Sequence, residues 1–374
     1  MPNSKSILRG CAVAALIGAI ALWAWDSRDP TAPELETAAT TATTLPARGK
    51  IQALVQQPAV TNLGATTEEA GRSPDSKKEK LSLVKRMENG KMLSPDPAKL
   101  AAYLHENSGN AEALLTVSRL TNNLPLLRQA AQSNPGDPRI QLDLAVRGDT
   151  PEERLEALNR LRELAPDNAL VSYLSAREQF QRGDSDAAIA ALNGIGNASQ
   201  LNDYVPESIQ SAEEAYLAVG YTPAEAKAAA VLGLARPQLK SLNELSKSLA
   251  ELRQSYAQAG DLQAASTVGQ LGTELGRRLQ NQSPFIIDEL VGIAVETRLL
   301  KQSPAEAAIN ATGQTAGERL AELGARRKEI NTLAAKATPA LNALTDASAM
   351  TYFDRQKVYG EVEALRWLAK RNGQ

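Results

Sequence analysis

Cysteine and histidine are almost absent from this sequence. Its 374 residues include one of each, Cys11 and His105. An intramolecular disulfide needs two cysteines, and most protein zinc sites are built from cysteine and histidine side chains. We therefore predict no disulfide within the chain and no metal site. His105 is expected beside Glu106 near the end of a short helix, where the helix dipole favours a cation.

Aromatic residues are also scarce. They make up 4% of the chain, although 43% of the residues are hydrophobic, and alanine and leucine account for most of that share. Sheets are enriched in β-branched and aromatic residues, whereas alanine and leucine favour helices. No stretch alternates apolar and polar residues with the period of two that is typical of a strand. The composition therefore predicts an all-α protein.

Neither sign of charge is in clear excess. The chain has 41 basic and 43 acidic residues, which leaves a net charge of −2. Nucleic-acid-binding proteins usually carry a basic surface that attracts the phosphate backbone. We therefore predict no nucleic-acid partner.

Motifs of nucleotide-binding and hydrolytic enzymes are missing as well. The sequence has no Walker A motif, no GxGxxG turn, no GxSxG elbow and no calcium-binding loop. Paired carboxylates such as Glu152-Glu153 and Glu213-Glu214 are adjacent in sequence and point to different parts of a helix. We predict no catalytic residue, no cofactor and no enzymatic activity. The alternative is a cell-envelope hydrolase with a carboxylate site that no sequence motif reveals.

One long apolar run does occur, at the N-terminus. Lys5 and Arg9 precede the 15 residues of Cys11–Trp25, CAVAALIGAIALWAW. A membrane-spanning helix needs about 20 apolar residues and a signal-peptide core about 7–15. We predict that residues 1–30 form an uncleaved signal-anchor or transmembrane segment. The basic flank predicts a cytoplasmic N-terminus and an extracytoplasmic, periplasmic body. Cleavage near Ala21, which would release a soluble periplasmic binding protein, is the alternative.

Residues 31–94 are expected to form a disordered linker. From Thr31 to Pro74 the chain is rich in Ala, Thr, Pro and Gly and shows no sustained apolar period. Such a composition buries too little apolar surface to offset the entropy of ordering. The basic residues between Lys77 and Lys91 indicate a solvated lead-in to the next domain, with contact to anionic lipids as the alternative.

From residue 95 onward, helical patterns alternate with short breaks. Ser94-Pro95-Asp96-Pro97 is a helix-start signal, and the segments between breaks predict helices of about 10–15 residues. Leu249–Leu275 is expected to form two short helices around a turn at Gly260. The tail predicts two long helices, Ala316–Ala337 and Ser348–Arg371. The other breaks lie at 134–138, 148–151, 166–168, 183–184, 194–196, 221–223 and 283–284.

Two stretches share a pattern of small residues around a turn. The first has a proline, a small residue, a turn glycine and a second small residue at Pro166, Ala176, Gly183 and Ala188. The second has Leu252 and Tyr256 in its first helix, and Gly260 and Ala265 repeat the spacing of Gly183 and Ala188. Here the chain resembles the tetratricopeptide repeat family. The repeats are degenerate, because the turn positions Gly183, Gly260 and Ser303 are 77 and 43 residues apart, whereas uniform repeats are spaced by about 34.

The resemblance implies a tetratricopeptide-like α-α superhelix, or solenoid, over residues 95–312, with a C-terminal helical cap over residues 313–374. It also implies a concave groove lined by the first helix of each pair. The candidate groove residues are Tyr173, Arg177, Phe180, Gln181, Lys247, Gln254 and Gln258. Family members that clamp a peptide carboxylate use Lys and Asn at defined groove positions. This chain has Tyr173, Arg177, Ala250 and Gln254 there, so that ligand class is not supported.

Taken together, the anchor, the linker and the repeats predict a membrane-anchored, extracytoplasmic helical-repeat scaffold. We expect it to mediate protein–protein interaction in a bacterial cell envelope, with a protein or peptide as the partner. The hydrolase and the soluble periplasmic protein are the alternatives.

Overall fold

The structure is a computed structural model of the chain and describes Leu83, residues 95–196 and residues 199–371. Contacts divide the chain into two units, and all described residues belong to the unit that contains Leu81–Gln374. Every named element in these ranges is an α-helix, and β-pairing among the described residues is limited to two isolated bridges. The predicted all-α fold is confirmed. The predicted anchor over residues 1–30, and the linker apart from Leu83, lie outside the described residues.

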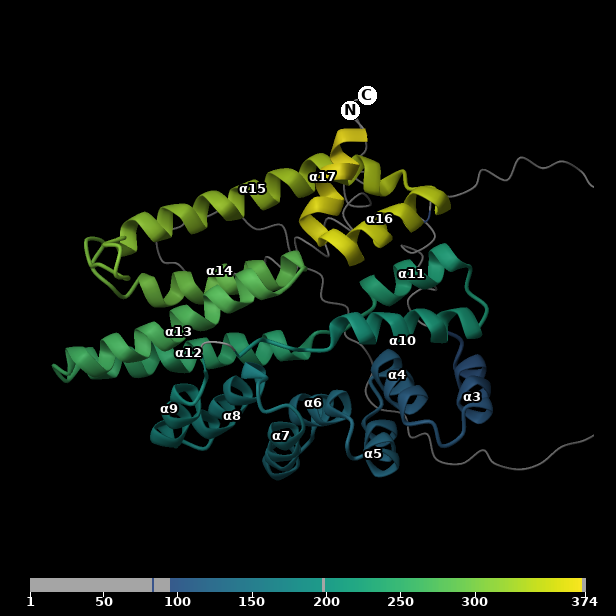
Figure 1. Cartoon of the computed structure of the whole chain (residues 1–374), viewed down its shortest axis with the longest axis horizontal. Coiled ribbons are helices and arrows are strands. Elements are labelled where there is room, and N and C mark those ends of the chain that lie inside the picture. Colours follow the sequence, from purple (N-terminus) through teal and green to yellow (C-terminus); the bar gives the residue numbers. More distant parts are fainter. Residues whose placement is uncertain (1–82, 84–94, 197–198, 372–374) are drawn as a thin grey trace, which may run out of the picture. The chain divides into compact units, whose positions relative to one another are not determined.

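Figure 1 shows the helices in chain order. The first group is α3 (Pro97–Glu106), α4 (Ala111–Thr121), α5 (Leu124–Ser133), α6 (Pro138–Arg147), α7 (Pro151–Leu164), α8 (Ala169–Gln181) and α9 (Ser185–Asn193). The second group is α10 (Val205–Ala218), α11 (Pro223–Leu232), α12 (Pro237–Gln258), α13 (Leu262–Gln282), α14 (Ile286–Leu300), α15 (Ala316–Asn342), α16 (Asp346–Tyr359) and α17 (Glu361–Arg371).

Side-chain caps explain where most of these helices begin. The Asn110 carboxamide accepts hydrogen bonds from two backbone N–H groups in the first turn of α4, and Asp96 caps α3 in the same way. Thr222 and Glu225 form a reciprocal capping box at the start of α11. Proline in the first turn, as at Pro97, adds no unsatisfied N–H group. These Asp, Asn, Thr and Pro signals are readable in the sequence, and the predicted breaks do separate the observed helices.

Helix length was predicted less well. The turn at Gly260, which has a φ of 83°, joins α12 and α13, but these helices are 22 and 21 residues long rather than short. The glycines in α13 let this helix approach its neighbours closely. The predicted helix Ser348–Arg371 is in fact two helices, because Gly360, with a φ of 84°, separates α16 from α17.

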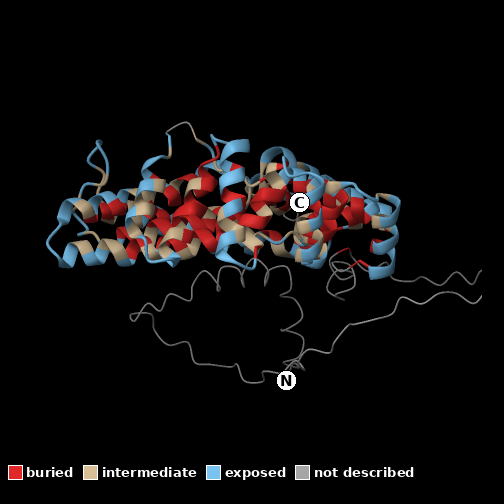
Figure 2. Ribbon diagram, turned by 90° about the horizontal axis from the view of Figure 1, so that it is seen from below, coloured by how far each residue is buried: buried red, intermediate tan, exposed pale blue. Residues whose placement is uncertain are grey.

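Successive helix pairs pack in chain order at the start of the described part. The pairs α4–α5, α6–α7 and α8–α9 follow one another, and α10 then packs back on α4 while α12 packs back on α8 and α6. One buried core joins helices α4–α9 to α12–α14, and a second core joins α14 to α15, α16 and α17. Figure 2 shows these buried residues between the helices and the exposed residues on their outer sides. The helices therefore do not form one open series of pairs, because α10 and α12 cover the earlier ones.

Leu83 is the one described residue before Pro95. It is 1% exposed, belongs to the second core, and donates its backbone N–H to the carbonyl oxygen of Leu344 at 3.3 Å.

None of the described helices combines the length and the hydropathy needed to cross a bilayer.

Candidate functional site

The candidate groove residues of α8 lie against another helix of the same chain. Tyr173 is 2% exposed and belongs to the core that α8 shares with α12. The Arg177 guanidinium donates to the Glu244 carboxylate of α12, with an Nη2–Oε2 distance of 2.7 Å, and also to Glu178. Phe180 is partly buried at the edge of this core, whereas Gln181 is exposed at the end of α8. The Tyr173 ring is therefore not accessible to a partner.

The three candidate residues of α12 are all exposed, but they do not lie in one cavity with the α8 set. Gln254 lines an open groove between α12, α13 and the segment after α14. Lys247 and Gln258 are exposed outside the lining of that groove. The structure thus separates the seven residues, and their role in binding stays a prediction.

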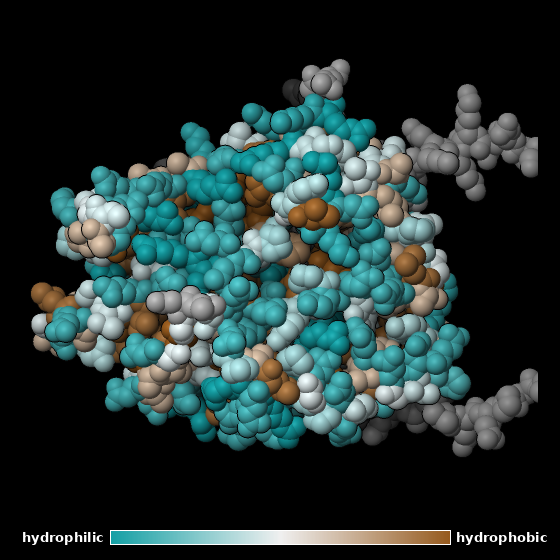
Figure 3. All heavy atoms as spheres, in the orientation of Figure 1, coloured by the Kyte–Doolittle hydropathy of each residue, from teal (hydrophilic) through white to brown (hydrophobic). Residues whose placement is uncertain are grey.

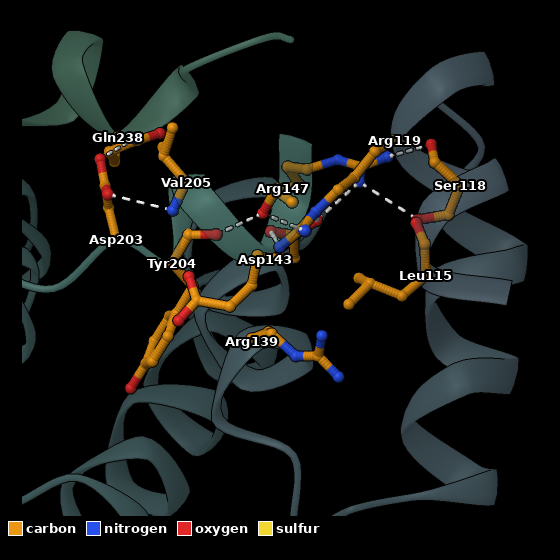
Figure 4. Close-up of polar contacts among 12 residues, drawn as sticks. Leu115, Ser118, Arg119, Arg139, Asp143, Arg147, Asp203, Tyr204, Val205 and Gln238 are labelled. Carbon is orange, nitrogen blue, oxygen red and sulfur yellow. Dashed lines mark hydrogen bonds and ion pairs between the residues drawn. The ribbon is translucent and has the colours of Figure 1, made fainter. Parts of the chain in front are cut away.

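Polar contacts hold α10 in its place across the earlier helices. In Figure 4, Arg119 of α4 and Arg147 of α6 converge on Asp143. Arg119 donates from Nε and Nη2 to the two carboxylate oxygens of Asp143, each at 2.9 Å, and from Nη1 to the Ser208 hydroxyl of α10 at 2.5 Å. Arg147 donates to Asp143 at 3.1 Å and to the Ser118 carbonyl oxygen at 3.0 Å. The Arg119–Ser208 hydrogen bond joins α10 to α4. Arg119 and Arg147 are both paired with Asp143, so neither arginine is left without an anionic partner that a ligand could replace.

A large open groove lies at the turn end of α12 and α13, and we call it the α12–α14 groove. It encloses about 840 Å³ between these two helices and residues 300–311. Figure 3 shows hydrophobic atoms at the end of the surface where the α12–α13 hairpin lies, within a mainly hydrophilic face. Leu262 on its edge is 71% exposed. The lining residues are Arg253, Gln254, Ala257, Leu262, Ala265, Ser266, Gly269, Gln270, Thr273, Leu300, Gln302, Ser303, Pro304 and 307–311.

Arg253 is the charged residue of that lining. Its Nη2 donates to the Ser303 hydroxyl at 2.7 Å, and its Nη1 donates to the Leu299 carbonyl oxygen. The guanidinium packs closely against α13 at Gly269. A Cβ atom added at that glycine would lie only 3.1 Å from the Arg253 Cζ atom. Burial lowers the pKa of Arg253, and no carboxylate pairs with it in the described part of the chain. A partly desolvated cation in this groove is suited to an anionic group.

The position of Arg253 within α12 is itself a sequence signal for a functional residue. Leu249 and Tyr256 lie on the apolar face of α12, and Arg253 is four residues after the first and three before the second. Residues with these spacings share one face of a helix. A charged residue on an apolar face is a candidate for a functional or specifically paired group. Its partners could not be read from the sequence, because Leu299 at the end of α14 and Ser303 just after it are about 50 residues away.

A second cluster surrounds the start of α14, at a smaller pocket of about 280 Å³. Arg236, just before α12, donates to the Asp288 Oδ2 atom at 2.6 Å and to the Asp203 Oδ2 atom at 2.5 Å. Both aspartates line the pocket, and Asp288 is 1% exposed. Glu361 approaches from α17 and accepts a hydrogen bond from the Ile286 backbone N–H at 2.8 Å. We call this cavity the Asp288 pocket.

Burial controls the protonation of this cluster. Burial raises the pKa of Asp288 to about 6, although the neighbouring Arg236 opposes that rise. Burial also raises the pKa of Glu361, whose hydrogen bond from Ile286 acts in the opposite direction. Asp203 and Asp288 share a single arginine, which stands between the two carboxylates. The sequence did not indicate this cluster, because Asp203, Arg236 and Asp288 come from three distant segments. The hydrolase alternative, which needs a carboxylate pair, remains a hypothesis.

The substitution Asp288→Asn is expected to change how stability depends on pH. Between an ordinary pKa of 3.8 and the raised value of about 6, the folded protein binds a proton that the unfolded chain releases. This stabilisation is complete below pH 4 and is lost as the pH rises through 6, by an amount on the order of 3 kcal/mol. The asparagine variant lacks this term, so its stability relative to wild type should increase from pH 4 to pH 7.

Chemical denaturation of both proteins at several pH values measures this difference. Asp354→Asn, at a carboxylate with a side chain 56% exposed, controls for the loss of one surface charge. A difference between Asp288→Asn and wild type that stays constant from pH 4 to pH 7 would contradict the assignment.

Comparison with protein-family models, with curated proteins and with solved structures finds no match to this chain.

Proposed function

We propose that this chain is a membrane-anchored scaffold whose helical body binds an extended segment of another protein outside the cytoplasm. The observation that carries the proposal is the α12–α14 groove, which is large, open and lined mainly by small neutral side chains. The N-terminal apolar run supports the anchor, and the similarity to tetratricopeptide repeats supports a role in protein interaction. In this proposal the partner site lies at the α12–α13 hairpin and not on the concave side of α8, which α12 covers.

The groove lining suits a polypeptide backbone. Alanine, glycine and serine side chains leave room for a chain to approach the helices closely. The amide side chains of Gln254, Gln270 and Gln302 carry both donors and acceptors, which an extended backbone needs for its own N–H and C=O groups. Exposed Leu262 and partly buried Ile309 provide apolar contacts at the two sides of the groove.

Arg253 determines the chemistry expected of the partner. It is a partly buried cation, its hydrogen bonds to the Leu299 carbonyl and the Ser303 hydroxyl go to neutral oxygens, and a carboxylate would compensate its charge. Charge-assisted hydrogen bonds from a guanidinium to a carboxylate are stronger than neutral ones. The bound segment should therefore place a glutamate or aspartate side chain against Arg253 and small apolar side chains along Ala265 and Ile309.

A photo-crosslinking residue introduced at Ser266 tests this proposal in the full-length chain within native membranes. Ser266 is exposed and lines the groove, so a bound segment should be captured there. The adduct should disappear when Arg253→Gln is combined with the same probe. The probe placed at Glu251, which is exposed on α12 outside the groove, serves as the matched control.

The captured segment then decides the outcome. A synthetic peptide of that segment should bind at least tenfold more tightly than a peptide with its acidic residue replaced by the amide, and Arg253→Gln should abolish the difference. A tenfold change in affinity corresponds to about 1.4 kcal/mol. Equal adducts at Ser266 and Glu251, or an adduct unaffected by Arg253→Gln, would refute the groove as the partner site.

A further inference from the structure

Aromatic and basic side chains gather on the surface of the last two described helices, α16 and α17, which lie next to each other in Figure 1. Val358 and Tyr359 of α16 are large apolar side chains that are 69% and 61% exposed. Residues three or four apart share one face of a helix, so both lie on the face that carries Arg355. We call this surface the α16–α17 patch. Its residues are Arg355, Val358, Tyr359, Trp367, Lys370 and Arg371.

The arginines of the patch stack on its aromatic rings. The Arg355 Cζ atom lies 5.2 Å from the centre of the Tyr359 ring and 5.4 Å from the centre of the Trp367 ring. The Arg371 Cζ atom lies 5.0 Å from the same Trp367 ring. Cation–π contacts attract a guanidinium to a ring without removing its charge. Two positive charges are therefore held at one indole ring.

Acidic side chains close in sequence to the patch have other partners. Asp354 pairs with Lys227 at 2.5 Å, Glu363 pairs with Arg366, and the Glu361 carboxylate accepts a backbone N–H from α14. The three basic side chains of the patch have no carboxylate partner within the described part of the chain. Like charges at short range repel one another, so a surface with several negative charges would stabilise the patch.

The chain that precedes Leu83 joins the body at the core that α16 and α17 share. Leu83 is buried in that core with Phe353 and Leu368, and its backbone N–H donates to Leu344, between α15 and α16. The N-terminal apolar run lies upstream, and the inference rests on the proposal that this run is a membrane anchor. A flexible tether of about 60 residues would hold the body within roughly 45 Å of the bilayer. Since the tether joins the body at this core, α16 and α17 are favoured to meet the lipid.

We propose that the α16–α17 patch binds the surface of an anionic phospholipid bilayer, with its three basic side chains on lipid phosphates and with Val358 and Tyr359 among the headgroups. Tyrosine and tryptophan favour the membrane–water interface, and basic side chains are attracted to anionic lipids. A soluble phosphate would leave Val358 exposed to water, whereas a bilayer surface offers both charge and apolar contact. The position of the tether favours a bilayer over an acidic protein segment.

Trp367 can report this contact, because the other two tryptophans, Trp23 and Trp25, lie in the N-terminal run. The full-length protein with Trp23→Phe and Trp25→Phe is reconstituted in vesicles of phosphatidylcholine alone or mixed with phosphatidylglycerol. Both kinds of vesicle are made with and without a headgroup spin-labelled lipid, which quenches tryptophan fluorescence at short range. Quenching should be at least twofold greater with phosphatidylglycerol. It should fall to the phosphatidylcholine level at about 1 M salt, where the Debye length is about 3 Å.

Variants of the patch should weaken the quenching. Each basic residue near an anionic surface contributes about fivefold to binding, so Lys370→Gln with Arg371→Gln should lower the ratio of bound to free patch at least tenfold. At the salt concentration that halves the wild-type quenching, this variant should keep less than about a fifth of the wild-type signal. Val358→Asp, at an exposed position, adds a carboxylate to the patch and should have a similar effect. The matched control is Lys240→Gln with Arg160→Gln, which removes the same two charges from exposed positions on α12 and α7 and should keep the wild-type quenching.

Three results would overturn the proposal. Quenching that is equal in the two kinds of vesicle, or that survives both patch variants, would leave the patch to an acidic protein segment. Relief of the quenching by an excess of sn-glycerol 3-phosphate would indicate a site for a soluble phosphate. Flotation with phosphatidylcholine vesicles reports the N-terminal anchor separately, so failure of the anchor is distinguishable from failure of the patch. If the protein does not float with phosphatidylcholine, flotation that requires phosphatidylglycerol still tests the patch.

Discussion

Replacing Gly292 by alanine should destabilise the protein by about 2 kcal/mol or more, even though alanine is the better helix former. A Cβ atom at position 292 would lie 2.5 Å from the Gly276 carbonyl oxygen and 2.9 Å from the Gln280 backbone nitrogen. Both of these are main-chain atoms of α13, so they cannot move aside as a flexible side chain does. The helices α13 and α14 would have to separate, and their shared contacts with Leu275 and Val295 would loosen.

Gly324→Ala is the matched control for this effect. Gly324 lies on the exposed side of α15, and a Cβ atom there would meet nothing within 4 Å. Because alanine has a higher helix propensity, this variant should be more stable by about 0.5–1 kcal/mol. Denaturant unfolding of the two variants and the wild type measures the expected loss of stability in Gly292→Ala and the expected gain in Gly324→Ala. Equal or greater stability of Gly292→Ala would show that α13 and α14 do not approach as closely as described.

Replacing Glu296 by alanine is expected to cost about 3 kcal/mol. Glu296 is fully buried, and its carboxylate accepts from Arg319 Nη2 at 2.9 Å, from Gln280 Nε2 at 2.7 Å and from Arg277 Nε at 3.2 Å. Removing one partner of a buried ion pair typically costs about 3–5 kcal/mol because the remaining charge is left uncompensated. The lower end of that range applies, since the Arg277 and Arg319 side chains are 32% and 23% exposed and water can reach them.

The same residue has a defined pH dependence. Burial acts to raise the pKa of Glu296, but hydrogen bonds from Arg319 and Gln280 outweigh burial and lower the pKa below its usual 4.5. The stabilisation is therefore present above pH 4.5 and is lost as the pH falls through the lowered pKa. Glu296→Gln should remove this acid-sensitive term while keeping the shape of the side chain.

Glu329 provides the control for the Glu296 variants. It also pairs with two arginines, Arg326 and Arg366, but its side chain is 51% exposed. Exposed ion pairs contribute little to stability, so Glu329→Ala should change the unfolding midpoint far less than Glu296→Ala does. Thermal and denaturant unfolding of both variants makes the comparison. Similar losses at the two sites would contradict the role assigned to burial.

Much of the local structure could be predicted because its causes are local. Asn110, Thr222 and Pro97 start helices through bonds or dihedral angles within one turn, so their effect is visible in a short stretch of sequence. The helix break at Gly360 was harder to predict, because a glycine in a helical pattern marks either a break or a close contact with a neighbouring helix. In α13 the glycines are contacts, and at Gly360 the glycine is a break with a positive φ.

The candidate sites could be predicted only in part, because they are assembled from distant segments. Gln254 was predicted to line a groove and is exposed on α12, but the sequence did not indicate which residues would face it. Tyr173 was expected in an open groove and is buried by α12, which returns to pack on α8. The role of Asp288 could not be predicted, because Arg236, which pairs with both Asp288 and Asp203, comes from a distant segment of the chain.

Composition and local signals are enough to predict an α-helical protein and the start of most of its helices. Its alanine- and leucine-rich composition, its helix caps and its prolines act over a few residues, and no later packing reverses them. Which helix faces are covered depends instead on how distant helices pack together. Burial and charge pairing depend on helices that are far apart in the chain and pack together, as α12 does with α8 and α10 with α4. The open α12–α14 groove and the buried carboxylate of Asp288 result from such packing contacts.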